Sequence, residues 1–275
     1  MTTPVSVKKF AICCYAGICL YLSRMLSLPP LHFSILGWLA VTGGAFAFGL
    51  SKGGLTGLGI FPVLLFAVVF QARESTGFVL PLLIVGDLCA IVVYHRVVIW
   101  KIFWRLLPPA LAGVVFGYYL MGRISEAAFG PLIGWIIITL IALQVLRSSL
   151  GEKIDHVFES HSFGLGMGVL AGVTTMLANA AGPVATLYFL TMRLPKWNLI
   201  GTSAWFFFVI NLCKVPFSAG LGLTNAYSLT LALVLAPLVI VGFFAGRHIA
   251  GHLPQKTFER FVLVCTAVGA LKLIG

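Results

Sequence analysis

Apolar residues run along the chain in long stretches that are separated by short polar or glycine-rich breaks. The pattern predicts eleven hydrophobic segments, at 10–28, 34–50, 55–70, 76–94, 105–122, 128–147, 162–177, 180–193, 197–217, 226–250 and 256–274. Several of them approach the roughly 20 residues that a helix needs to cross a bilayer. We therefore expect an all-α polytopic membrane protein.

The composition agrees with membrane embedding. Of 275 residues, 60% are hydrophobic and 9% are charged, whereas soluble domains carry about 25% charged residues. The six cysteines all lie inside apolar stretches without the spacing of a metal or redox site, so we expect no disulfide bonds. The composition therefore argues against a water-soluble fold.

Two stretches of the chain repeat the same order of residues. Each begins with a turn of small residues, Gly53–Gly59 in the first and Asn179–Pro183 in the second, and continues into an apolar stretch. Equivalent positions follow at separations that drift from 121 to 129 residues: Pro62 and Pro183, Gly77 and Gly201, Asp87 and Asn211, Pro108 and Pro237, Gly113 and Gly242, Gly117 and Gly246, Gly122 and Gly251, and Phe129 and Phe258. Duplicated halves are typical of secondary transporters, which hold the substrate between the repeats.

The basic residues indicate the orientation of the segments. If consecutive segments alternate across the membrane, 13 of the 18 Lys and Arg residues, Lys52 among them, fall on the side of Lys8 and Lys9. Four fall on the other side, and Lys214 lies inside a segment. Cytoplasmic loops carry the excess of Lys and Arg, so we expect a cytoplasmic N-terminus. The same rule accounts for the net charge of +11 without nucleic-acid binding.

Each repeat holds five segments, an odd number, so we expect the two halves to be inverted relative to each other. The predicted organisation is an N-terminal transmembrane anchor at 1–30, a first repeat at 31–150, a cytoplasmic connector at 151–161 and a second repeat at 162–275. The first two segments of each repeat are short and interrupted by glycine and proline. They either span the membrane or form re-entrant hairpins, and such segments at matching places indicate a transport site.

Three elements support a family comparison: the glycine-rich turn before Pro62, the stretch Asn179–Pro183, and Gly201-Thr202-Ser203 followed by Asn211. Together they resemble the TauE/SafE sulfite exporter family over residues 34–275. The resemblance implies a membrane carrier that exports sulfite, sulfonates or related small sulfur-containing organic anions. The first half departs from the family pattern, with Lys52 and Thr56 in its turn and Gly77-Phe78-Val79 where the second half has Gly201-Thr202-Ser203.

The two turns hold the candidates for anion binding. An oxyanion needs hydrogen-bond donors, and a turn that opens a helix offers free backbone N–H groups at the positive end of the helix dipole. The candidates are Ser51, Gly53, Gly54, Thr56 and Gly57 in the first turn and Thr174, Thr175, Asn179, Ala180 and Gly182 in the second. We expect the inverted turns to meet around one anion. Alternatively the glycines only allow close helix packing, which is the role we assign to the pairs Gly113/Gly117 and Gly242/Gly246.

Three ionisable residues add to this candidate site. Lys52 is either a cytoplasmic loop residue or, in a re-entrant hairpin, an anion-binding charge. Asp87 and Lys214 lie inside apolar segments, where each charge costs at least about 2.5–3.5 kcal/mol. They either form an ion pair that joins the repeats, or Lys214 binds the anion while Asp87 carries a proton.

Polar residues near Lys214 complete the set of candidates. Thr202, Ser203 and Asn211 share its segment, and they either bind substrate or make hydrogen bonds between helices. The aromatic run 205–208 is expected to face lipid or to pack. His248 and His252 lie four residues apart without a third ligand, so we expect no metal site.

The pattern as a whole predicts a secondary carrier that works by alternating access, with proton coupling as an option. The resemblance implies that the carrier exports a small sulfur-containing anion. An anion channel, or a permease for another small organic anion, is the alternative, because inverted half-helices also form filters. We expect the anion and the lipid bilayer of a bacterial inner membrane as partners, no cofactor and no nucleic acid. No catalytic motif or nucleotide-binding loop is present, so we do not expect an enzyme. The sequence indicates no oligomeric state.

Overall fold

The computed structural model describes residues 33–125, parts of 127–142, 161–192 and 194–252. All the regular secondary structure of these residues is helical, and short turns join the helices. The predicted anchor at 1–30, the connector up to residue 160 and the segment 256–274 lie outside the described residues, as does part of the segment 128–147. The all-α prediction is confirmed for the described residues.

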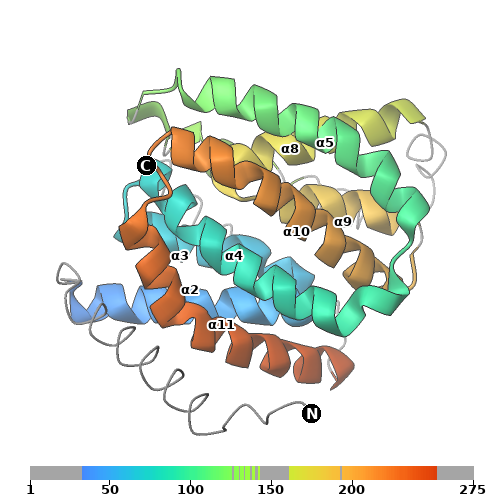
Figure 1. Ribbon diagram of the computed structural model, residues 1–275, viewed down its shortest axis with the longest axis horizontal. Coiled ribbons are helices and arrows are strands. Elements are labelled where there is room, and N and C mark those ends of the chain that lie inside the picture. The colour runs from blue at the N-terminus through green and yellow to red at the C-terminus, as the bar shows by residue number, and fades with distance from the viewer. Residues whose placement is uncertain are drawn as a thin grey trace, which may run out of the picture. The chain divides into compact units, whose positions relative to one another are not determined.

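The helices follow the two predicted halves. The first half comprises α2 (Ile35–Gly53), η1 (Thr56–Gly59), α3 (Ile60–Val69), α4 (Ala72–Tyr94), η2 (His95–Val97) and α5 (Trp100–Met121). The second comprises α8 (His161–Ala178), α9 (Ala181–Thr191), α10 (Lys196–Gly220) and α11 (Ala226–His252) (Figure 1). In the described part, α2, α4 together with η2, α10 and α11 are long and apolar enough to cross a membrane. These four stretches agree with a polytopic membrane protein.

The two opening helices compare differently with their predicted short segments, 34–50 and 162–177. α2 has 19 residues and is long enough to span a membrane, whereas α8 has 18 residues and its apolar stretch Ser162–Ala178 remains short. α2 continues past the apolar stretch through Ser51 and Gly53 because both residues are buried, so packing and not hydropathy decides where the helix ends. The short elements are α3 and α9, with 10 and 11 residues. Their re-entrant course in a membrane stays a prediction.

Close helix pairs join the two halves. α2 lies against α11, where a Cβ atom on Gly246 would collide with the backbone of Leu50. α5 lies against α8 in the same manner, because a Cβ atom on Gly113 would collide with the backbone of Val169 (Figure 1). The predicted packing role of Gly113 and Gly246 is therefore confirmed.

The third pair consists of the equivalent helices α4 and α10, which pack against each other. Their equivalent residues are in direct contact, since Asn211 Nδ2 donates a hydrogen bond to Asp87 Oδ2 at 2.7 Å. Each of the three pairs joins one half to the other: α2 to α11, α5 to α8 and α4 to α10. This reciprocal arrangement is expected of repeat-related halves, while their inversion across a membrane stays a prediction.

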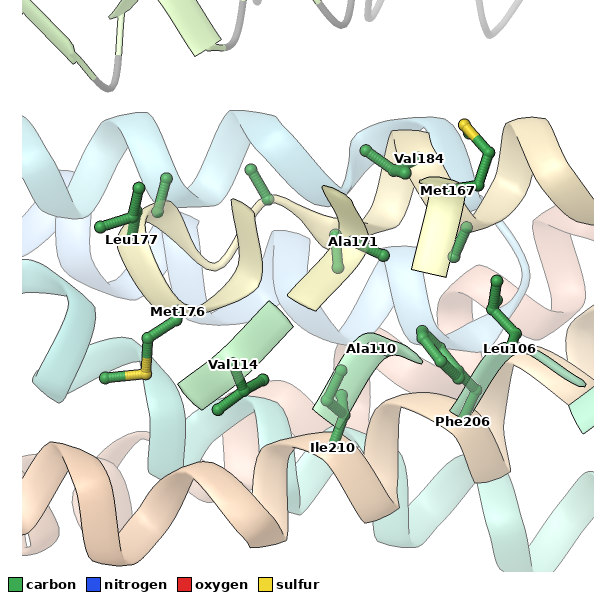
Figure 2. Packing of buried hydrophobic residues seen from close by; sticks show 14 of the residues in the cluster. Leu106, Ala110, Val114, Met167, Ala171, Met176, Leu177, Val184, Phe206 and Ile210 are labelled. Atoms are coloured by element: carbon green, nitrogen blue, oxygen red, sulfur yellow. The ribbon is translucent and has the colours of Figure 1, made fainter. Parts of the chain in front are cut away.

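A large apolar core lies among α5, α8, α9 and α10. In Figure 2, Ala110 and Val114 of α5 lie between Ala171 of α8 and Ile210 of α10. Val184 of α9 belongs to the same cluster. The core therefore fixes both helices that flank Asn179, the residue at which the helical structure is interrupted between α8 and α9.

Candidate functional site

The helical structure is interrupted between α8 and α9, and this interruption, called the second break, places the start of α9 inside the protein. α8 ends at Ala178, Asn179 has a φ of 50°, and α9 begins at Ala181. Asparagine adopts this left-handed conformation more readily than most residues because its short polar side chain forms local hydrogen bonds. The first N–H groups of a helix have no acceptor within it, and they carry the positive end of its dipole. Asn179 N and Ala180 N already donate to Thr175 O and Thr174 O at 3.0 and 3.2 Å. Pro183 has no N–H group, so the donors that this helix start offers to an anion are the N–H groups of Ala181 and Gly182.

The break between α2 and α3 is built differently. Gly54 has a φ of 139°, and η1 precedes α3. The turn is closed by a hydrogen bond from Leu55 N to Leu50 O at 3.3 Å. Tyr94 Oη donates a second one to Gly53 O at 2.8 Å. The N–H groups of Gly54 and Leu55 are thus bonded within the chain, like those of Asn179 and Ala180. The first break adds the polar side chains of Ser51, Lys52 and Thr56.

Both breaks border one cavity of about 60 Å³. The predicted site residues that line it are Ser51, Lys52, Thr56, Thr175, Asn179, Ala180, Gly182, Ser203 and Asn211. A buried water needs about 10–15 Å³ of such space, so the cavity holds roughly four or five waters. This is room for a small anion with three or four oxygen atoms.

Lys52 is a partly buried partner of Asp87 within α2 and not a loop residue, so the loop alternative for Lys52 is wrong. Its Nζ atom donates to Asp87 Oδ1 at 2.5 Å, and the two side chains are 13% and 0% exposed. The same Nζ atom lies 4.4 Å from the centroid of the Phe207 ring. Among the described residues that line the cavity, Lys52 carries the single formal charge. Removing it from the count of basic residues leaves 12 against four, which does not change the predicted orientation.

Lys214 holds the second break and does not pair with Asp87. Its buried Nζ atom donates to Asn179 Oδ1 at 2.5 Å, to Thr175 O at 2.7 Å and to Thr175 Oγ1 at 3.2 Å. Three acceptors match the three N–H groups of an ammonium. The Asn179 amide also donates from Nδ2 to Thr76 O of α4 at 2.9 Å. The ion pair between Asp87 and Lys214 is therefore wrong, because Asp87 bonds Lys52 and Asn211 instead.

Two buried polar atoms in the cavity wall have no hydrogen-bond partner among the described residues. They are Ser203 Oγ and Asn211 Oδ1, and their residues are 4% and 1% exposed. A buried polar atom without a partner costs about 1–3 kcal/mol. Ser203 Oγ can donate to a solute in the cavity, whereas Asn211 Oδ1 can only accept, so a water or another hydrogen-bond donor is the partner that suits it.

The other predicted site residues shape the backbone around the cavity. Thr202 Oγ1 accepts a hydrogen bond from Ile99 N at 3.0 Å, which joins α10 to the start of α5. Thr174 Oγ1 donates to Leu170 O at 2.8 Å within α8. Gly53 and Gly54 close the end of α2, where a Cβ atom would meet α11, and Gly57 belongs to η1.

Some residues of the cavity wall have no signal in the sequence. Phe207 belongs to the aromatic run expected to face lipid or to pack, but it lines the cavity beside Lys52. Phe48 and Thr186 also line the cavity. An aromatic residue in an apolar helix looks the same in sequence whether it faces a cavity, a helix or lipid. Helix rotation decides among these, and it is a property of the packed structure.

Comparison with known proteins gives two matches. The sequence model of the sulfite exporter TauE/SafE family matches residues 38–273. The "Probable inner membrane transporter protein TsaS" of Comamonas testosteroni is 26% identical over 181 residues, which cover 65% of this chain and 73% of that protein. No solved structure matches.

Proposed function

Because the chain belongs to the TauE/SafE sulfite exporter family, we propose that it is a secondary transporter that exports a small sulfur-containing anion, such as sulfite or a sulfonate. The family and the similarity to an inner membrane transporter support membrane transport. We place the protein in a bacterial inner membrane with a cytoplasmic N-terminus. The family and the chemistry of the cavity support this substrate class.

The observation that carries this proposal is the convergence of three kinds of anion-binding group on one cavity. Lys52 contributes an ammonium, Ser203 an unpartnered hydroxyl, and α9 the N–H groups at its start. Ammonium and hydroxyl groups are donors that an oxyanion accepts. A helix start adds positive potential, which favours an anion over a neutral solute. The cavity volume limits the substrate to a few heavy atoms.

Alternating access fits the way the halves pack. The cavity lies between the breaks of the two halves, and its wall includes α10. Gly113 and Gly246 sit at close contacts between halves, where small residues let backbones approach. We propose that rocking of one half against the other opens the cavity to each side in turn, as in other transporters with repeated halves.

The test is counterflow in proteoliposomes. Vesicles with purified full-length protein are preloaded with unlabelled sulfite or methanesulfonate, and uptake of the labelled anion is measured. The carrier proposal predicts that preloading accelerates uptake. Uptake that does not saturate and does not respond to preloading would instead indicate an anion channel.

Two lysine variants provide the matched comparison. Lys52→Ala removes the cation in the cavity, and Lys101→Ala removes an exposed cation of α5. We expect exchange to be lost in the first variant and kept in the second. Equal losses, or no uptake by wild-type vesicles of verified protein content, would contradict the proposed function.

A further inference from the structure

The cation that faces the cavity already has an anion beside it. Lys52 Nζ lies 2.5 Å from Asp87 Oδ1, and the carboxylate is buried completely. A carboxylate oxygen and a sulfite or sulfonate oxygen are chemically similar acceptors for an ammonium. An anion that enters the cavity therefore competes with Asp87 for Lys52.

The second carboxylate oxygen is held separately. Asp87 Oδ2 accepts a hydrogen bond from Asn211 Nδ2 at 2.7 Å. When Lys52 turns to a substrate, Asn211 still supports this oxygen, but Oδ1 loses its partner. A buried carboxylate without a cation is strongly unfavourable, and it is relieved when the group binds a proton.

We propose that Asp87 is the counter-ion which the substrate replaces at Lys52, and that Asp87 takes up a proton on Oδ1 when the anion binds. Anion and proton then cross the membrane together, so net export needs an outward anion gradient that exceeds the opposing gradient of the proton. The proton comes from the aqueous side to which the cavity is open and leaves when Lys52 returns to Asp87. This inference rests on the proposed function and adds the coupling ion to it.

The charges around Asp87 agree with a single proton site. In the described part of the chain, Lys52 of α2 and Lys214 of α10 interact electrostatically with Asp87. Lys214 is committed to three oxygen acceptors at the second break, so Lys52 is the cation that can exchange partners.

Among the side chains that the structure describes, the other titratable groups make no hydrogen bond or ion pair with Asp87. α3 carries none, and the remaining ones on α4 and on the described elements packed against it are Arg73, Glu74, Cys89, Tyr94, His95, Arg96, His161, Lys196, Cys213, Tyr227, Arg247, His248 and His252. The hydrogen bonds and ion pair found for Asp87 involve Lys52 and Asn211 instead. A proton-linked effect that disappears with Asp87 is therefore assigned to this carboxyl group.

The substitution Asp87→Asn tests the proton site with little change in shape. The second half already has asparagine at the equivalent position, Asn211. An amide oxygen can still accept the hydrogen bond from Asn211, but an amide cannot take up the proton. Glu74→Gln is the matched control, because it makes the same change in an exposed residue in the first turn of α4.

The experiment measures anion and proton movement in the same vesicles. Full-length wild-type, Asp87→Asn and Glu74→Gln proteins are reconstituted with a pH-sensitive dye inside the liposomes. Uptake of labelled methanesulfonate, a permanent monoanion, and of labelled sulfite is then recorded at several pH values. Methanesulfonate is used for the pH series when it is carried, because its own charge stays constant.

We expect wild-type and Glu74→Gln vesicles to acidify as the anion enters. Their apparent affinity should fall as pH rises, by up to about tenfold per pH unit for one linked proton. Asp87→Asn should exchange the anion without acidification and with an affinity that does not change with pH.

The outcomes separate the two proposals. Anion uptake without proton movement in the wild type, or proton movement that persists in Asp87→Asn, would overturn the coupling and leave the transporter in place. No uptake of either anion by the wild type would overturn the proposed function itself. If Asp87→Asn does not reach the vesicles in a folded form, the wild-type proton measurement decides alone.

Discussion

The break between α2 and α3 and the break between α8 and α9 stand at matching places in the two halves, but they present different groups to the shared cavity. The first presents the side chains of Ser51, Lys52 and Thr56 over a turn whose backbone is bonded internally. The second presents the start of α9, and behind it Lys214 holds Asn179.

The difference gives the two breaks different roles in the proposed site. A lysine side chain is flexible, so in the proposed mechanism Lys52 exchanges Asp87 for a substrate. The start of a helix is held by its backbone, so α9 offers donors in fixed positions. An anion site that must also release its ligand combines a movable charge with a fixed set of donors.

The largest effect is expected at the movable charge. Lys52→Ala leaves Asp87 buried without its cation, which destabilises a protein by about 3–5 kcal/mol. It also removes the single formal charge from the described cavity wall. We expect the abundance of the protein in the membrane to fall and exchange to drop at least about 30-fold per molecule. Abundance is measured by quantitative immunoblot and exchange by counterflow.

A double variant separates folding from binding at the same break. Lys52→Ala combined with Asp87→Asn removes both charges, so it should recover most of the abundance without recovering exchange. Exchange at the wild-type rate in the double variant would show that the first break supplies no essential charge.

A smaller effect is expected when the second break loses its support. Lys214→Met keeps a long side chain but leaves Asn179 Oδ1 and Thr175 O without their donor. Each buried acceptor without a donor lowers the folding stability by about 1–3 kcal/mol. We expect a lower thermal stability and an exchange rate reduced by about 10-fold. The rate should stay above that of Lys52→Ala, because Lys214 acts through the backbone of the break. A Lys214→Met protein with wild-type stability and rate would contradict this role.

Two substitutions of Asn179 separate its backbone from its side chain. Asn179→Gly keeps access to the left-handed conformation, whereas Asn179→Ala must adopt it at a cost of about 1–2 kcal/mol. Both lose the hydrogen bonds to Lys214 and Thr76. We expect the glycine variant to be more stable and to exchange faster than the alanine variant, as measured by thermal unfolding and counterflow. The reverse order would mean that the shape of the break does not matter.

The smallest effects are expected from two neighbours on α10. Ser203→Ala removes an unpartnered hydroxyl from the cavity wall. If this hydroxyl donates to the substrate, its loss costs about 1 kcal/mol of binding free energy and should raise KM by about fivefold. Thr202→Val removes the acceptor of the hydrogen bond from Ile99 N. It should therefore lower thermal stability with little change in KM. A KM effect confined to Thr202→Val would reverse the assignment of the two residues.

The sequence by itself determined the helices and the places where they break. The predicted segment 197–217 corresponds to α10 (Lys196–Gly220) and 226–250 to α11 (Ala226–His252). The family resemblance over 34–275 is confirmed by the family match over 38–273. Hydropathy, glycine and proline act within a few residues along the chain, so the order of letters is enough to find such features.

The tertiary structure alone decided which polar groups meet. Lys52 and Asp87 are separated by 35 positions, and Asp87 and Asn211 by 124, so no local pattern records either contact. Thr202 and Ser203 are adjacent in sequence, but successive helix positions differ by about 100° around the axis, so one joins α5 while the other faces the cavity. Which side chain becomes a ligand and which becomes a support depends on how each helix is rotated in the packed bundle.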